Sequence, residues 1–367
     1  MRVLIVTLAF LGLAACSSQP ATEARAPAPP AIDIVAPPGA GAGVALPSGA
    51  LTTIMFGSCH TAERPIPILR TIAQARPDLF VYLGDNVYGD THGDMSLPEL
   101  RAQYALLAAH PDFQALRTSV PMIATWDDHD FGLNDAGGEF EAKALAKTLF
   151  EEFWGTGART GSRDGVYDSY VFGPEGRRVQ IILLDTRYGR TPLTRLPQPS
   201  DRGRYARSTD PAQRMLSEAQ WAWLAEELRR PAEIRIIASS IQVLADGHDW
   251  EAWETLPLEQ ARLYETIRTS GARGVVFVSG DRHVAGLYAE DGRLSHRAYE
   301  LTASSLNLSF RETSDERSSN QLGDLYAPVN FGTMRIDWAG RRLTLEVNDL
   351  EGRAVREQAI AFADLGL

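Results

Sequence analysis

Four short polar clusters, each directly after a hydrophobic run, most constrain the fold of this 367-residue chain. Buried carboxylates at strand ends are tolerated only where cations or hydrogen-bond donors neutralise them. Ligands of α/β sheets collect beyond the carboxyl ends of strands, so the clusters predict one split metal site. The clusters are Gly57-Ser58-Cys59-His60, Gly84-Asp85-Asn86-Val87-Tyr88, Trp126-Asp127-Asp128-His129-Asp130 and Gly280-Asp281-Arg282-His283.

Strand-like and helix-like segments alternate from Leu51 onward, and antiparallel hairpins interrupt the alternation. This pattern favours an α/β fold, a two-sheet β-sandwich flanked by helices, over a purely parallel sheet. We expect one catalytic domain over residues 50–367. Two long connections, residues 186–215 and 303–330, are predicted to be active-site loops.

The N-terminus predicts export. Residues 1–16 combine a positive start, an apolar run too short to span a bilayer, and Leu13-Ala14-Ala15-Cys16. This last tetrapeptide resembles the bacterial lipobox, which implies lipidation of Cys16 and, with Ser17 after it, an outer-membrane anchor facing the periplasm. An ordinary signal peptide cut near the alanines is the alternative. Residues 17–49, rich in Ala, Pro and Gly, are expected to form a flexible tether.

The net charge of −11 argues against nucleic acid as the main partner, because phosphate backbones attract basic surfaces. A negative protein can still bind phosphate esters when metal cations dominate the local field. We expect a monomer.

Each cluster has a functional and a structural interpretation. Asp85 and Tyr88 have the spacing to face one point as metal ligands, or they are a turn carboxylate and a core tyrosine. His129 among carboxylates should have a raised pKa suited to a general acid, or the segment is a solvated acidic turn. Asp281 and His283 would project the same way from an extended chain as two ligands at a strand end, or they are a surface Asp-x-His. Without Cys16, Cys59 has no disulfide partner, so it is either simply buried or held by a metal.

Five motifs carry a resemblance to a known family: FGSCH, LGDNVY, TWDDHDFGLND, LDTRYGR and SGDRHVAG, in order over residues 56–286. Together they resemble the calcineurin-like metallophosphoesterase superfamily, most closely its alkaline phosphatase D (PhoD-like) branch. The chain departs from the superfamily in three places. Ser-Cys replaces Asp-x-His, Asp281 replaces the first histidine of Gly-His-x-His, and the intermediate histidine is absent, with Ser240 and Gln242 near that point.

The resemblance implies two unlike metal sites. Oxygen ligands suit calcium, whereas a thiolate, a phenolate and an imidazole suit Fe³⁺. His129 takes the proton-donor position, and Arg187 is expected either to bind a phosphate oxygen or to form a structural salt bridge. Asn134 is predicted to be a calcium ligand or a substrate contact, with an ordinary turn residue as the alternative. The implied ligands are Cys59, Asp85, Tyr88 and His283 for Fe³⁺, and Asp85, Asp128, Asp281 and Asn134 for Ca²⁺.

The predicted function is therefore hydrolysis of phosphate monoesters or diesters by a metal-activated water. A phospholipase-D-like phosphodiesterase acting on lipid head groups is the alternative within enzymes. A non-catalytic envelope lipoprotein and a calcium-stabilised binding module are the alternatives outside them, although the second would not require Cys59 or Tyr88.

Overall fold

A computed structural model describes residues 43–309 and 316–367, which belong to one compact unit, Asp33–Leu367. The predicted signal segment, Cys16 and most of the predicted tether therefore lie outside the described residues. Residues 43–49, at the end of that tether, contain no helix or strand. Within the described ranges, no helix is both long enough and apolar enough to cross a membrane.

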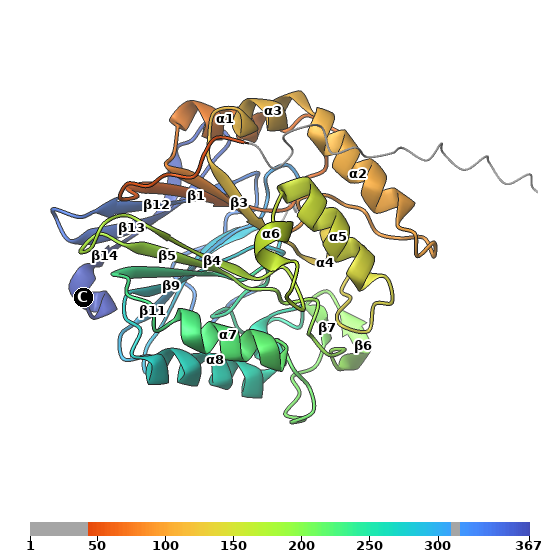
Figure 1. Cartoon of the computed structure of the whole chain (residues 1–367). Coiled ribbons are helices and arrows are strands. Elements are labelled where there is room, and N and C mark those ends of the chain that lie inside the picture. The colour runs from red at the N-terminus through yellow and green to blue at the C-terminus, as the bar shows by residue number, and fades with distance from the viewer. Residues whose placement is uncertain (1–42, 310–315) are drawn as a thin grey trace, which may run out of the picture. The chain divides into compact units, whose positions relative to one another are not determined.

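Two six-stranded mixed sheets form the centre of the fold (Figure 1). In the first sheet the parallel strands β1, β2 and β3 continue into an antiparallel half. Its order is β14 (Ala354–Ala361), β13 (Arg342–Asn348), β12 (Phe331–Asp337), β1 (Thr53–Gly57), β2 (Leu79–Leu83) and β3 (Met122–Thr125).

In the second sheet β5, β8, β9 and β11 run parallel, with an antiparallel strand at each edge. Its order is β10 (Ala285–Glu290), β11 (Ala298–Ala303), β9 (Val275–Ser279), β8 (Ile234–Ala238), β5 (Val179–Leu183) and β4 (Asp168–Phe172). A separate antiparallel hairpin is formed by β6 (Arg195–Ser200) and β7 (Gly203–Tyr205).

Helices cover the outer faces of both sheets (Figure 1). The first sheet is covered by α1 (Pro67–Ala75), α2 (Pro98–Ala109), α3 (Pro111–Arg117) and α5 (Lys143–Trp154), and the second by α7 (Glu218–Glu227) and α8 (Pro257–Ser270). The shorter elements are α4 (Asp128–Phe131), α6 (Gly157–Thr160), η1 (Trp253–Thr255) and η2 (Phe362–Leu365). The predicted helix-flanked two-sheet sandwich is confirmed.

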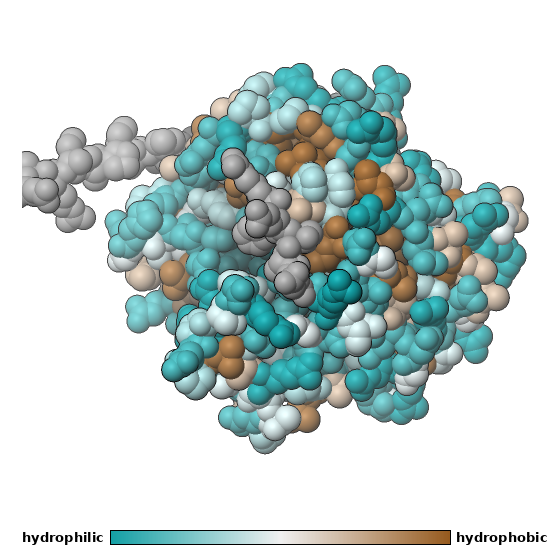
Figure 2. All heavy atoms as spheres, turned by 180° about the vertical axis from the view of Figure 1, so that it is seen from behind, coloured by the Kyte–Doolittle hydropathy of each residue, from teal (hydrophilic) through white to brown (hydrophobic). Residues whose placement is uncertain are grey.

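Alternation along the strands explains the layers. In β2, Leu79, Val81 and Leu83 pack between the sheets, whereas Phe80 and Tyr82 pack toward the helices. Successive strand side chains point to opposite faces, so a strand buried on both faces is hydrophobic throughout. On the face seen in Figure 2, by contrast, hydrophobic residues form small groups among hydrophilic ones.

Several elements were not predicted from the sequence, among them α3, the edge strand β14 and the hairpin β6–β7. The helix α3 begins at Pro111, and the extended His110 before it separates α3 from α2. The edge strand β14 has one buried residue among its eight and contains the polar run Arg356-Glu357-Gln358, which weakens the pattern expected of a strand. The hairpin β6–β7 lies within the predicted active-site loop 186–215, and its first strand contains two prolines.

Candidate metal centre and active site

The carboxyl ends of parallel strands from both sheets meet at one place. Cys59 follows β1, Asp85 follows β2 and Asp127 follows β3, while Asp281 follows β9 of the other sheet. The hydroxyl Oγ1 of Thr125 donates across the sheets to the carbonyl of Leu184 at 2.8 Å. The four clusters are therefore gathered by sheet topology rather than by proximity in sequence.

Glycines permit this close approach. A Cβ on Gly84 would lie 2.5 Å from Cβ of Asp127, and Gly84 has a φ of +103°. A Cβ on Gly280 would lie 2.5 Å from Oγ of Ser58 in the other sheet. Any larger residue at these two positions would push the strand ends apart.

The backbone is strained where the candidate ligands lie. Among the residues that the structure describes, eight non-glycine residues have a positive φ, and five of these are at the site. Each such conformation costs about 1–3 kcal/mol and persists only where surrounding structure imposes it. The five are Cys59, Asp85, Asp135, Asp281 and His283.

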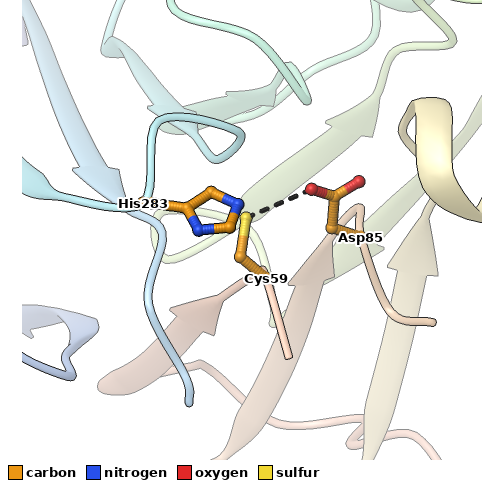
Figure 3. Close-up of side chains that lie close together, drawn as sticks. All are labelled: Cys59, Asp85 and His283. Atoms are coloured by element: carbon orange, nitrogen blue, oxygen red, sulfur yellow. Dashed lines mark hydrogen bonds between the residues drawn. The ribbon is translucent and has the colours of Figure 1, made fainter. Parts of the chain in front are cut away.

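The predicted iron ligands form one group. One ligand atom each from Cys59, Asp85 and His283 lie within 4.8 Å of one another (Figure 3). The Sγ of Cys59 is 3.3 Å from Oδ2 of Asp85. The hydroxyl of Tyr88 lies 3.1 Å from that same oxygen and 2.9 Å from Nε2 of His283. The Tyr88 hydroxyl therefore lies between the Asp85 carboxylate and the His283 imidazole, where all three could bind one metal ion.

The electrostatics of this first group suit a cation. Burial raises the pKa of the Cys59 thiol to about 12 and raises that of Tyr88. Burial and the nearby His129 lower the pKa of His283 to about 4, so its imidazole is neutral. Burial, together with Cys59, raises the pKa of Asp85 well above its ordinary value. A cation would favour the anionic forms that burial disfavours here.

A second, oxygen-rich group adjoins the first and shares Asp85 with it. Ligand atoms of Asp85, Asp128 and His129 lie within 4.8 Å of one another, as do those of Asp127, Asp128 and Asp281. Burial and Asp127 raise the pKa of Asp281 well above its ordinary value. In the described structure, Oδ1 of Asp85, Oδ1 of Asp128 and Oδ2 of Asp127 are buried without a hydrogen-bond partner. Unsatisfied carboxylate oxygens fit a hard cation such as calcium.

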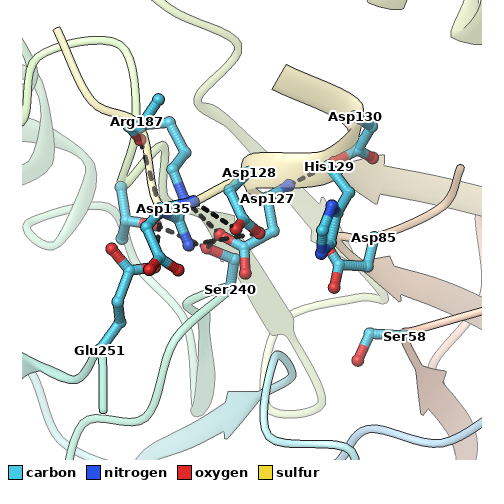
Figure 4. A network of polar contacts seen from close by, with 12 residues as sticks. Ser58, Asp85, Asp127, Asp128, His129, Asp130, Asp135, Arg187, Ser240 and Glu251 are labelled. Atoms are coloured by element: carbon cyan, nitrogen blue, oxygen red, sulfur yellow. Dashed lines mark hydrogen bonds and ion pairs between the residues drawn. The ribbon is translucent and has the colours of Figure 1, made fainter. Parts of the chain in front are cut away.

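His129 lies between the carboxylates as the sequence predicted (Figure 4). Its Nδ1 is 2.5 Å from Oδ2 of Asp90, and its ring stacks on Tyr88 with 4.1 Å between centroids. Burial lowers its pKa, but Asp128, Asp85 and Asp90 outweigh burial and raise that pKa to about 11. The imidazole is thus held protonated and oriented, with its other nitrogen directed away from Asp90.

Arg187 was expected either to bind a phosphate oxygen or to form a structural salt bridge, and the structure places it in a salt bridge. Its side chain is fully buried, and its guanidinium lies 2.5 Å from Oδ1 of Asp127, 2.7 Å from Oε2 of Glu251 and 3.6 Å from Oδ1 of Asp128. Figure 4 shows the guanidinium enclosed by these carboxylates. The salt-bridge alternative is therefore the one that the structure supports, because a guanidinium enclosed by carboxylates is not available to a substrate phosphate.

The structure favours Asp135 over Asn134. Asn134 is exposed, whereas the carboxylate of the next residue lies within 4.8 Å of ligand atoms of Asp128 and Glu251. Gln242 is also engaged elsewhere, since its amide nitrogen donates to Tyr288 and Thr302. The oxygen that replaces an imidazole near this point belongs to Ser240, which donates to Asp127 at 2.6 Å.

Sequence reasoning missed Glu251 and Ser304. Glu251 lies in a loop with no preceding hydrophobic run, so no strand end signalled it. Ser304 follows β11, its Oγ lies 3.4 Å from Sγ of Cys59, and it accepts the backbone N–H of His283 at 2.7 Å. Ser304 directly follows the hydrophobic strand β11, at the start of the predicted loop 303–330. This position after a strand was the signal that could have identified it.

This fold and site define a metallophosphoesterase-like protein. The structure is similar to one titled "Structure of PhoD", with a TM-score of 0.66 and 16% identity over 84% of this chain and 73% of that one. It is also similar to purple acid phosphatase PPD1 from yellow lupin (Lupinus luteus) seeds, with a TM-score of 0.56 and 11% identity over 88% of this chain and 56% of that one. Identities this low show a shared fold.

The family follows from the sequence. The profile of the PhoD-like phosphatases matches residues 54–333, and the chain therefore belongs to the PhoD-like phosphatase family. It is also 22% identical over 275 residues to alkaline phosphatase D of Bacillus subtilis (strain 168). That alignment covers 64% of this chain and 46% of the relative, so the chain spans less than half the relative's length.

Proposed function

We propose that this protein is a metal-dependent phosphoesterase that hydrolyses phosphate monoesters or diesters. The observation that carries the proposal is the group of Cys59, Asp85 and His283, which shares Asp85 with the oxygen-rich group around Asp128. Two ligand groups with one common carboxylate are the arrangement that a pair of neighbouring cations needs. Membership of the PhoD-like phosphatases supports the same reaction class.

The two groups differ in the chemistry of their donors. We assign Fe³⁺ to Cys59, Asp85, Tyr88 and His283, because soft and phenolate donors suit it. We assign Ca²⁺ to Asp85, Asp128 and Asp281, because their donors are all oxygens. Bound cations supply positive charge for the phosphoryl oxygens and the acidity that makes water a nucleophile near neutral pH.

The protein's own residues supply the proton. The carboxylates around His129 raise its pKa to about 11, so we expect its imidazole to be protonated at neutral pH, and Asp90 orients the ring. Its position beside Asp85 and Asp128 suits donation to the departing oxygen of an ester. Arg187 acts indirectly, because its charge holds the carboxylates of Asp127 and Asp128 in place.

For the N-terminus, we propose export and attachment to the envelope through a lipid on Cys16, as the Leu-Ala-Ala-Cys motif predicts. In a bacterial host, the full chain should enter the detergent phase on Triton X-114 partition. A Cys16→Ser variant should move to the aqueous phase. Equal partition of the two proteins would refute the lipid anchor without affecting the catalytic proposal.

Elemental analysis combined with an ester panel tests the enzymatic proposal. The purified protein should contain iron and calcium, absorb visible light through its phenolate–Fe³⁺ pair, and hydrolyse 4-nitrophenyl phosphate or its bis ester. Cys59→Ser and Tyr88→Phe should each reduce the iron content and the visible absorption. Asp112→Asn is the matched control, since Asp112 is a buried carboxylate on α3 whose hydrogen bonds are to Ile66 and Arg70. An active, colourless and iron-free preparation would refute the iron assignment, and inactivity of the metal-loaded protein on both esters would refute the phosphoesterase.

A further inference from the structure

The β6–β7 hairpin carries concentrated positive charge in an acidic protein. Residues 195–207 contain four arginines and a single carboxylate, whereas the whole chain has a net charge of −11. Five of the six residues of β6 are exposed. In Figure 1 the hairpin lies outside both sheets, on the same side as α4. This charge is therefore displayed to solvent rather than used within a core.

Direct contacts connect the hairpin to the acidic site. The hydroxyl of Tyr205 donates to Oδ2 of Asp135 at 2.6 Å, and Nη1 of Arg204 lies 3.3 Å from the same oxygen. The backbone N–H groups of Arg204 and Tyr205 both donate to the carbonyl of Asp249, two residues before Glu251. Gly203 permits this contact, because a Cβ there would lie 2.0 Å from the carbonyl carbon of Asp249. The hairpin is thus fixed at the edge of the site.

Trp250 links the hairpin to the loop that carries Asp281 and His283. Its half-buried ring has the guanidinium of Arg204 at 5.1 Å and that of Arg282 at 5.6 Å. Arg282 lies between the two candidate metal ligands and is 6% exposed. Its Nη2 contacts Glu316, but its Nε has no hydrogen-bond partner among the described residues. The two guanidiniums are each paired with a carboxylate, Arg282 with Glu316 and Arg204 with Asp135, and they hold the Trp250 ring between the metal loop and the hairpin.

Two hairpin arginines keep their charge free of carboxylates. Arg207 pairs with Glu254, and Arg204 with Asp135. In the part of the chain that the structure describes, Arg195 and Arg202 form no ion pair. Arg195 lies 5.4 Å over the ring of Tyr205, and Nη2 of Arg202 donates to the carbonyl of Gly247 at 2.6 Å. Both guanidiniums are exposed at the site edge and retain further N–H donors.

We propose that Arg195 and Arg202, together with the ring of Trp250, form a subsite for a second anionic group of the substrate. This inference rests on the proposed phosphoesterase function and specifies its substrate class: esters that carry a further phosphate beyond the scissile one. Guanidinium forks bind phosphate bidentately, and Trp250 offers an apolar face for the atoms between the two anionic groups. A basic edge also counteracts the repulsion of an anionic substrate by an acidic protein.

Binding of two phosphonates, whose C–P bonds are not hydrolysed, tests this subsite separately from turnover. Hexylphosphonate has one anionic end and hexane-1,6-diphosphonate has two. Titration calorimetry on the metal-loaded protein should show tighter binding of the diphosphonate. The double variant Arg195→Gln/Arg202→Gln should lose about five- to tenfold of that preference, as expected for two exposed ion pairs, with hexylphosphonate binding unchanged.

The matched control is Arg229→Gln/Arg342→Gln, which removes the same total charge. Both arginines are exposed, lie outside the site, and form no ion pair within residues 43–309 and 316–367. Retention of the preference in this control supports the subsite. An equal loss of the diphosphonate preference in both double variants would show that only net charge matters and would overturn the proposal. The proposal would also be overturned if the unaltered protein did not prefer the diphosphonate. Hydrolysis of 4-nitrophenyl phosphate, followed separately, reports on the catalytic proposal alone.

Discussion

Removal of the buried Arg187 charge should destabilise the protein strongly. An Arg187→Met variant keeps most of the side-chain volume but leaves Asp127, Asp128 and Glu251 without the guanidinium that lies 2.5, 3.6 and 2.7 Å from their oxygens. Breaking a buried pair by removing one partner costs about 3–5 kcal/mol, because the remaining charge is buried and uncompensated. Arg190 still pairs with Glu251, but among the described residues no other arginine pairs with Asp127 or Asp128, so we expect a loss within that range.

Urea denaturation of metal-free protein, followed by tryptophan fluorescence, measures this loss as a lower midpoint with an unchanged slope. Arg268→Met is the control, since Arg268 is 58% exposed and its ion pair among the described residues is with Glu265, one turn earlier in α8, where solvent screens both charges. A double variant with Glu251→Gln should be less destabilised than the sum of the single changes, because Glu251 is then neutral. A loss below about 1 kcal/mol, combined with a raised KM for 4-nitrophenyl phosphate, would refute this reasoning and return Arg187 to substrate binding.

Three further predictions concern the strand ends, the proton donor and acid stability. Gly84→Ala should lower metal content and stability, because its Cβ would lie 2.5 Å from Asp127. The control is Gly93→Ala, which has a similar φ of +108° but no atom within 4 Å of the added Cβ and should cost only backbone strain. Equal effects of the two changes in urea denaturation and metal analysis would contradict this. Asp90→Asn should reduce kcat by about 10- to 100-fold for esters with poor leaving groups and less for 4-nitrophenyl esters, because His129 loses its orienting carboxylate. The control is Asp291→Asn, which changes an exposed carboxylate. An equal loss of kcat for both kinds of ester would argue against the role of His129 as an acid. Burial disfavours the charged form of Asp168, but Arg159 and Arg163 outweigh burial and hold its pKa below the ordinary 3.8. A lowered folded-state pKa contributes stability that is present above the unfolded pKa and is lost as pH falls through the folded value. Asp168→Asn should therefore be less stable than the unaltered protein at pH 7. The difference should shrink as the pH falls further below 3.8, and a constant difference in urea midpoints would refute this.

Much of the architecture could be predicted because each layer leaves a local signature. Strands such as Leu79–Leu83 are buried on both faces and therefore read as continuous hydrophobic runs. Where that signature is weak, as in β14, which has one buried residue among its eight and three polar residues at its centre, the prediction missed the element. Antiparallel hairpins could be expected because turn residues separate two strand-like segments, as Asp291-Gly292 does between β10 and β11.

The site was predictable where a ligand directly follows a hydrophobic strand. Cys59, Asp85, Asp128, Asp281 and His283 all meet this condition, and the structure brings all five into the ligand groups. Asp135 and Glu251 do not, because each lies in a loop that returns to the site only in the folded chain.

The sequence by itself determined the types of donor available and the strand ends that carry them. A thiol, a phenol, imidazoles and carboxylates at those positions already divide into a mixed set and an oxygen-rich set. Only the tertiary structure decided which charges face each other. It enclosed Arg187 among carboxylates, set Tyr88 between Asp85 and His283, and fixed a basic hairpin at the edge of the site. The physical reason is that electrostatic partnership depends on distance and burial, and both arise when strand ends and loops far apart in sequence pack together.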